Sequence, residues 1–369
     1  MRSQQSGQLQ SLTPLRGIAA LWVVLYHYAA QYLPALSTDG FTHLLDEGYL
    51  AVDLFFMLSG FVLTHVYWRV FTEPVRGSYG RFLLARVARL YPLHLFVLSL
   101  FIATALASRM VEYATTGAYE TVAIEGARSL TALVANLFML QGLKASELSW
   151  NYPSWSISIE FIAYLGFPLA LPWIWRARRS TKIVLALVLV AALAGLADMT
   201  HDDFDQWDGP LALLRCMPEF LIGSLLYTAF EGRSWMSLAR RDAVLVGLVA
   251  VLVLLLHLGV SDFVTILLFP ALILAAVANE GRAAALLNAA PLVWLGEISY
   301  SLYLFHGLVQ FVATRLLSAA GHDSRDDLSL AASLAIMAAM LVASLVCAGY
   351  AHRGVEKAGR QRLRLMFGA

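Results

Sequence analysis

The sequence predicts an all-α integral membrane protein: a bundle of about ten transmembrane helices, one short re-entrant or interfacial segment, and both termini in the cytoplasm. Of its 369 residues, 59% are hydrophobic and only 14% are charged, and the mean hydropathy is +0.68. A soluble domain of this size carries far more charge. Apolar stretches that approach the ~20 residues needed to cross a bilayer lie at residues 15–33, 48–68, 92–108, 154–175, 183–199, 211–230, 242–259, 262–279, 298–317 and 329–350.

The basic residues orient this bundle. With a cytoplasmic N-terminus, every arginine-rich loop falls inside, as the positive-inside rule requires. The stretch Leu130–Leu140 is short for a crossing, and a crossing there would move the cluster at Arg176–Lys182 outside, so we assign it as re-entrant or interfacial. The inward residues are Arg69, Arg76, Arg81, Arg86, Arg89, Arg176, Arg178, Arg179, Lys182, Arg233, Arg240, Arg241, Arg282 and the basic segment Arg353–Arg364; the outward loops carry Asp39, Asp46, Glu47, Glu112, Glu120, Glu125, Asp202, Asp203, Asp205 and Asp208.

The chain reads as one transmembrane domain, residues 1–369, with an N-terminal tail at 1–14 and a basic cytoplasmic tail at 351–369. The longest outer loop, 108–128, is too short to fold alone. Cys216 and Cys347 lie in apolar stretches and have neither disulfide nor metal-ligand spacing, so no metal is expected. The first apolar stretch is long enough to remain as a signal anchor.

Arg16 and His27 are the most informative pair in the chain. They lie eleven residues apart in LRGIAALWVVLYHY, so one helix presents both from nearly the same face, roughly 16 Å apart along its axis. Ionisable groups inside a bilayer are costly and usually functional. The pair therefore indicates anion binding at one end and proton chemistry at the other; the alternative for His27 is a satisfied buried histidine.

Asp53 and Glu160 are expected at the same outer depth as His27. Both of their helices enter from outside, so the three side chains could share a polar pocket in which a carboxylate orients the imidazole and keeps it basic. Each carboxylate could equally be a structural partner of a helix N-terminus or an arginine.

Arg86 and Arg89, in RFLLARVARLYPLH, are the second group of candidate functional residues. They are three residues apart, in a basic segment that ends at Pro92, where a helix could start. Guanidinium groups suit the phosphates of a nucleotide. Arginine-rich inner loops also occur in membrane proteins generally, so the arginine cluster alone does not establish a phosphate-binding site.

Other polar residues are assigned supporting roles. Arg215 and Glu219, four apart on one helix, are expected to pair with each other. His306 lies near Tyr300 and Tyr303, either in a structural histidine–tyrosine contact or in the active site. Trp150, Tyr152 and Trp155 are typical of an interfacial aromatic belt, although sugar stacking uses the same side chains.

Taken in order, these motifs resemble the acyltransferase-3 family of membrane-bound O-acyltransferases. The resemblance runs nearly end to end and has one departure: Phe161 follows Glu160 where many members have a second glutamate. The longer members' extracellular hydrolase-like domain is also lacking. The matching segments are LRGIAALWVVLYH, GYLAVDLFFMLSGFVL, RVAR, SWSISIEFIAY, RCMPEFLIG, GEISYSLYLFH and the late VEK.

The resemblance implies transfer of an acyl group, usually acetyl, from cytoplasmic acyl-CoA to a hydroxyl of a cell-surface glycan or its precursor, at the bacterial inner membrane. Arg16, Arg86 and Arg89 would hold the nucleotide phosphates. His27 would act as general base, or carry the acyl group itself, with Asp53, Glu160 and His306 in the catalytic set. No nucleic acid partner is implied, and the acceptor, the acyl chain and the oligomeric state stay open.

Two other classes compete with this interpretation. A proton-coupled transporter could use His27, Asp53 and His306 as a relay, but the cytoplasmic arginine pair and the lack of an internal repeat argue against it. An inactive structural or sensory bundle leaves the buried arginine, histidine and glutamate residues without an explanation.

Overall fold

The predicted all-α class is confirmed by a computed structural model of the chain. It describes residues 9–38, 40–73, 76–117, 126–143, 149–206, 209–231, 237–322 and 324–367, and within these ranges the regular structure is helical, with no β-strand. The expected loop residues Asp39, Glu120, Glu125, Asp208 and Arg233 lie outside the described part.

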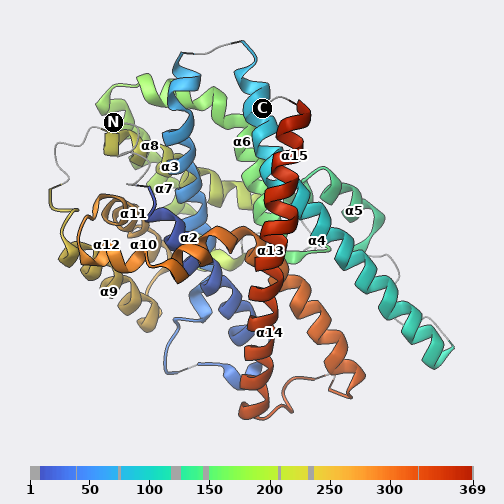
Figure 1. The fold of residues 1–369 in the computed structure, drawn as a ribbon. Helices are drawn as coiled ribbons and strands as arrows, with labels where there is room; N and C mark the ends of the chain where they lie inside the picture. The colour runs from blue at the N-terminus through green and yellow to red at the C-terminus, as the bar shows by residue number, and fades with distance from the viewer. Residues whose placement is uncertain are drawn as a thin grey trace.

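The helices follow one another along the chain with short connections (Figure 1). The first, α2, continues directly into a π-helical segment, Tyr26–Ala30, and another π-helical segment, His352–Lys357, joins the last two. The α-helices are α2 (Leu12–Leu25), α3 (Ala51–Thr72), α4 (Ser78–Thr116), α5 (Leu130–Leu137), α6 (Trp155–Arg176), α7 (Arg179–Met199), α8 (Ala212–Glu231), α9 (Asp242–Leu258), α10 (Asp262–Ile266), α11 (Phe269–Ala278), α12 (Arg282–Leu287), α13 (Ala290–Ala319), α14 (Leu330–Ala351) and α15 (Ala358–Phe367).

Seven helical segments of the described chain are long and apolar enough to cross a membrane. Two of the other expected spans are shorter helical segments, Asp242–Leu258 and Asp262–Ala278, and α2 is not among the seven. The expected count of about ten is thus supported in part, and the orientation of the termini stays a prediction. The seven are Asp46–Thr72, Ser78–Thr115, Tyr152–Arg176, Arg179–Met199, Gly209–Glu231, Ala290–Ala319 and Leu330–Met366.

One expected boundary was wrong. Pro92 does not begin a helix, because α4 starts at Ser78 and runs through it; the preceding leucines, arginines and alanines are strong helix formers. The predicted basic tail, residues 351–369, is helical as far as Phe367 and packs along α4, and its cytoplasmic location stays a prediction. The short segment after Leu130 forms α5, whose eight residues cannot span a bilayer.

Helices α2 and α13 run parallel and in close contact. An added Cβ at Gly17 would lie 2.5 Å from the backbone nitrogen of Gly296, and one at Gly296 would lie 2.0 Å from the carbonyl oxygen of Thr13. Ten residues further along each helix the rings of His27 and His306 meet, with their centroids 4.9 Å apart. Small residues at a crossing let two membrane helices approach this closely.

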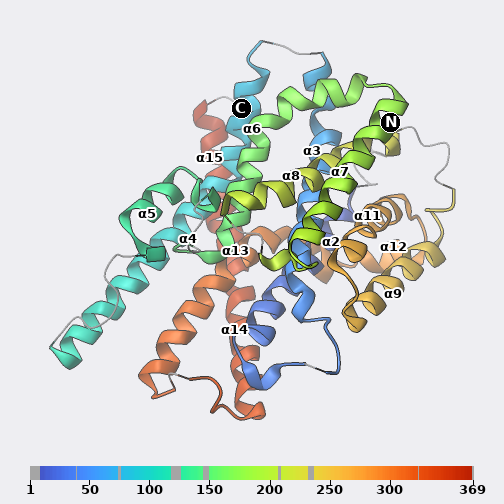
Figure 2. The same ribbon diagram turned by 180° about the vertical axis from the view of Figure 1, so that it is seen from behind.

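A second close contact joins α3 to α8. An added Cβ at Gly60 would lie 1.9 Å from the carbonyl oxygen of Phe220, and one at Gly223 would lie 2.0 Å from that of Met57. Beside this pair, α6 contains Pro168 and Pro172, and its last turns leave the direction of its first turns (Figure 2). A proline inside a helix removes a backbone hydrogen bond and favours such a bend.

We expect Gly60→Ala to destabilise the folded protein, because its methyl group would overlap backbone atoms of α8 that cannot move independently. Overpacking of this kind costs about 1–3 kcal/mol. The measurement is the melting temperature of the purified protein in one detergent. Gly247→Ala is the control, since nothing lies within 4 Å of its added Cβ; equal melting temperatures for the two variants would contradict the prediction.

Candidate active site

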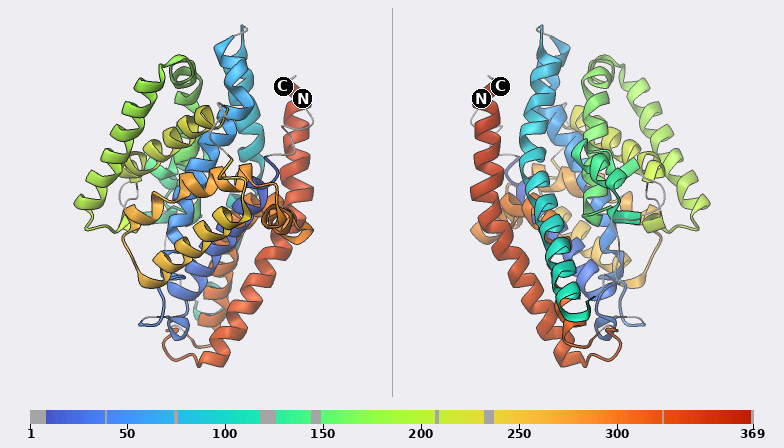
Figure 3. Two further views of the ribbon diagram at one scale, coloured as in Figure 1. Left: turned by 90° about the vertical axis from the view of Figure 1, so that its left-hand side faces the viewer. Right: turned by 90° about the vertical axis from the view of Figure 1, so that its right-hand side faces the viewer.

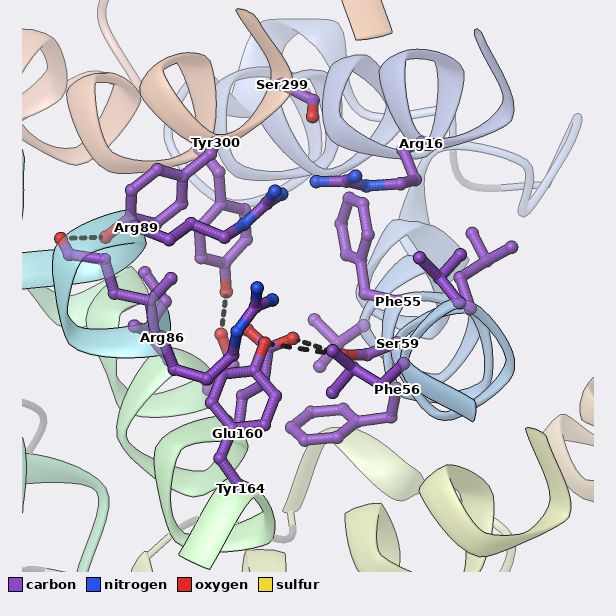
Figure 4. A pocket seen from close by; sticks show the side chains of 18 residues that line it. Arg16, Phe55, Phe56, Ser59, Arg86, Arg89, Glu160, Tyr164, Ser299 and Tyr300 are labelled. Atoms are coloured by element: carbon purple, nitrogen blue, oxygen red, sulfur yellow. Dashed lines mark hydrogen bonds between the residues drawn. The ribbon is translucent and has the colours of Figure 1, made fainter. Parts of the chain in front are cut away.

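A cavity of about 120 Å³ lies where α2, α3, α4, α6 and α13 meet (Figure 4). Its walls are mostly apolar, and its polar groups come from all five helices. The lining residues are Arg16, Val52, Phe55, Phe56, Leu58, Ser59, Val62, Leu63, Arg86, Arg89, Leu90, Ser156, Ile157, Glu160, Tyr164, Ser299, Tyr300 and Tyr303.

Three guanidinium groups point into this cavity from two helices. Figure 4 shows Arg16 entering from α2, and Arg86 and Arg89 entering from α4. Arg86 donates to the Tyr67 hydroxyl at 3.1 Å and stacks near its ring, yet its Nε is buried without a partner. Among the described residues, no hydrogen bond or ion pair to another side chain involves Arg16 or Arg89. The structure thus brings together the three arginines assigned to phosphate binding, with capacity left for an anion.

Glu160 is the carboxylate of this cavity, and it accepts a hydrogen bond from Ser59 Oγ at 2.6 Å. The expected grouping of Glu160 with His27 was therefore wrong. The reason is the register of α6: Ser156, Glu160 and Tyr164 are spaced by four residues, so they share the helix face that lines the cavity.

His27 instead lies against a second histidine and a tyrosine. The ring centroids of His27 and His306 are 4.9 Å apart, and that of Tyr152 is 5.0 Å from His27. His306 is completely buried, and neither of its ring nitrogens has a hydrogen-bond partner in the described part of the chain. His27 belongs to the π-helical segment of the first helix, a local distortion that is frequent at functional sites.

The protonation of His27 follows from its hydrogen bond. Its Nδ1 lies 2.9 Å from the backbone carbonyl oxygen of Val23. A carbonyl only accepts, so Nδ1 carries the proton and donates, and in the neutral ring Nε2 is left with a free lone pair. An imidazole in this tautomer can take a proton from a hydroxyl at Nε2.

Tyr303 joins the cavity to the histidine pair. Its hydroxyl is 2.7 Å from Ser156 Oγ, in the cavity wall, and its ring centroid is 5.6 Å from that of His306. Tyr300, one turn earlier on α13, lines the cavity and donates to the carbonyl oxygen of Leu90 at 2.7 Å. Tyr303 is thus in contact with both the cavity wall and the histidine pair.

Asp53 belongs to neither the cavity nor the histidine pair, because it forms a buried ion pair with Arg215. The Arg215 Nε donates to Asp53 Oδ1 at 2.8 Å and its NH2 group to Oδ2 at 2.5 Å. The same guanidinium donates to the carbonyl oxygens of Phe204 and Tyr49. The expected pairing of Arg215 with Glu219 was wrong, since the guanidinium reaches across to α3 and Glu219 lies buried beside the pair.

Tyr152, Ser156 and Ser59 are site residues that the sequence did not reveal. Tyr152 had been assigned to an interfacial belt, but its ring packs on His27 and its hydroxyl donates to Gln310 Oε1 at 2.7 Å. The four-residue spacing of Ser156 from Glu160 was an available signal. Ser59 gave none, because it lies in an otherwise apolar helix.

Comparison with known proteins gives a family match over most of the chain. The family model described as acyltransferase domain matches residues 9–352. Acyltransferase MdmB of Streptomyces mycarofaciens is 29% identical over 95% of this chain and 91% of its own length. O-acetyltransferase OatA of Staphylococcus aureus is 25% identical over 81% of this chain, which spans 50% of that longer protein. No solved structure matches the chain.

We expect Asp53→Asn to destabilise the protein by about 3–5 kcal/mol, because it leaves the Arg215 guanidinium buried without its countercharge. The double variant Asp53→Asn with Arg215→Met should recover part of this loss, because it removes the stranded charge. Thermal melting in detergent measures both. Glu297→Gln is the control, since its contact with Lys357 is 3.8 Å long and exposed. A double variant that is no more stable than Asp53→Asn alone would contradict this account.

Proposed function

Because the chain belongs to the acyltransferase-3 family, we propose that it moves an acyl group from cytoplasmic acyl-CoA to a hydroxyl of a cell-surface glycan or glycan precursor. The family predicted from the motifs is confirmed, and the chain is an enzyme that transfers acyl groups. One observation carries the finer proposal: a cavity with three arginines is joined through Tyr303 to a pair of histidines.

The cavity suits the nucleotide end of the donor. Acyl-CoA carries phosphates at one end and a thioester at the other, joined by a slender arm. Guanidinium groups bind phosphates through paired hydrogen bonds, and Arg16, Arg86 and Arg89 have donors available. Glu160 balances part of this charge before the donor binds, and the apolar wall formed by Phe55, Phe56 and its neighbours suits the arm.

The histidine end suits the acyl group and the acceptor. His27 would take the proton of the acceptor hydroxyl at Nε2 while the hydroxyl oxygen attacks the thioester carbonyl carbon. The negative charge on the carbonyl oxygen would be stabilised by the Tyr303 or Ser156 hydroxyl, which already contact each other. When the carbon–sulfur bond breaks, the CoA thiolate takes the proton from His27 and leaves as the thiol.

The other predicted site residues hold the reacting groups in place and do not react themselves. His306 packs on His27 and Tyr303, so it would fix the position of the His27 imidazole relative to the thioester. Asp53 and Arg215 stabilise the short helical turns at Tyr49 and Phe204 rather than entering the chemistry. We place the protein in the bacterial inner membrane. We take acetyl as the preferred acyl group because the relative OatA is an O-acetyltransferase.

We expect His27→Ala to lower the rate of CoA release at least about 100-fold, the usual contribution of a general base, while leaving donor affinity unchanged. The measurement is turnover of acetyl-CoA by protein reconstituted in liposomes, with binding measured separately by isothermal titration calorimetry. His257→Ala is the control, because that histidine is exposed on α9. Loss of binding in His27→Ala would contradict the assignment of His27 as base. Wild-type protein that neither binds nor consumes an acyl-CoA, but moves protons across the liposome, would replace the proposal with a transporter.

We expect the double variant Arg86→Ala with Arg89→Ala to weaken acetyl-CoA binding by at least tenfold, because each hydrogen bond to a charged group contributes about 1.5–3 kcal/mol. Arg81→Ala is the matched control on the same helix, since Arg81 is exposed and outside the cavity lining. Calorimetric titration at two salt concentrations measures the effect. Equal affinities of the double variant and the control for acetyl-CoA would show that the cavity does not bind the donor.

A further inference from the structure

The last helix, α15, carries a second group of arginines beside α4, the helix from which Arg86 and Arg89 enter the cavity. It lies along the first half of α4 (Figure 3). Gly359 makes the approach possible, because an added Cβ there would lie 2.5 Å from Cβ of Pro92. The next residue, Arg360, is thereby brought within electrostatic reach of Arg86 and Arg89.

A buried polar contact fixes α15 in this place. Glu356 Oε2 accepts hydrogen bonds from Ser301 Oγ at 2.8 Å and from His352 Nδ1 at 2.9 Å. Ser301 is on α13, beside the cavity residue Tyr300, so the contact ties the π-helical segment before α15 to the wall of the site. Arg360 follows Glu356 by one helical turn, so the same contact sets the position of its backbone.

The charges around Arg360 are mainly of one sign. Arg360 and Arg364 are four residues apart and half-buried on one face of α15, and the Nε of Arg364 is buried without a hydrogen-bond partner in the described chain. Arg86 and Arg89 of α4 lie within electrostatic reach of Arg360, and an acidic group within reach, Glu356, is already hydrogen-bonded twice. Like charges gathered this way repel one another unless an anion joins them.

We infer that Arg360 binds the ribose 3′-phosphate of the acyl-CoA donor, an inference that rests on the proposed function. The pyrophosphate occupies the arginines of the cavity, and the 3′-phosphate lies beyond it, at the end of the donor remote from the thioester. α15 has the matching position, because it rises from the level of α13 in Figure 1 while α13 descends toward its C-terminal end. Arg362 is exposed on the opposite face of α15 and takes no part.

The experiment compares the affinities of CoA and 3′-dephospho-CoA for the full-length protein in neutral-lipid nanodiscs, by calorimetric titration. The wild type should bind CoA roughly tenfold more tightly, as one charge-assisted contact requires. Arg360→Gln should lose this preference by weakening CoA alone, and Arg362→Gln should keep it.

Three results would overturn the inference. If Arg360→Gln weakens the binding of CoA and of 3′-dephospho-CoA equally, Arg360 contributes only a general positive potential and does not bind the 3′-phosphate. A wild type that binds neither nucleotide would refute the proposed function itself, whereas normal CoA binding with an unchanged preference in Arg360→Gln refutes only the role of α15.

Discussion

The parallel pairing of α2 and α13 is the constraint on which the site depends. Gly17 and Gly296 let the two backbones touch, and this contact fixes the register of every later residue on both helices. His27 and His306 each lie ten residues further along, so their rings meet about 15 Å from the glycines. One crossing thus sets the separation of the anion-binding and acid–base ends.

The charged groups divide into two kinds. Asp53 and Arg215 neutralise each other inside the bundle, and Arg215 also donates to the short helical turns at Tyr49 and Phe204. The pair is a structural arrangement that leaves no guanidinium charge for a ligand. Arg16 and Arg89 have no such partner among the described residues. Unpaired cations inside a membrane bundle are costly, so this contrast supports the proposal that Arg16 and Arg89 bind the donor.

The helical class could be predicted from the sequence, but the contacts between helices could not. Hydropathy predicted the helical class, and the spacing of Arg16 and His27 predicted one helix with two functions. Glu160 was assigned to the wrong end, and Arg215 was assigned the wrong carboxylate, because both depend on which helices pack side by side. Tyr152 was missed for the same reason: only tertiary contacts bring the loop before α6 to His27.

The position of Tyr303 between the two ends has a consequence for the energetics of the transfer. In the proposed reaction the phosphates stay with the arginines on one side of this ring. The acyl group moves outward, and the proton of the acceptor hydroxyl moves inward to the CoA sulfur. A neutral thioester and a neutral hydroxyl thus become a neutral ester and a neutral thiol, and no net charge crosses the ring. By contrast, an elementary charge carried across the whole membrane would gain or lose about 2.3 kcal/mol per 100 mV. Outward acylation of this kind would proceed at the same free energy in energised and de-energised cells, driven by the thioester alone.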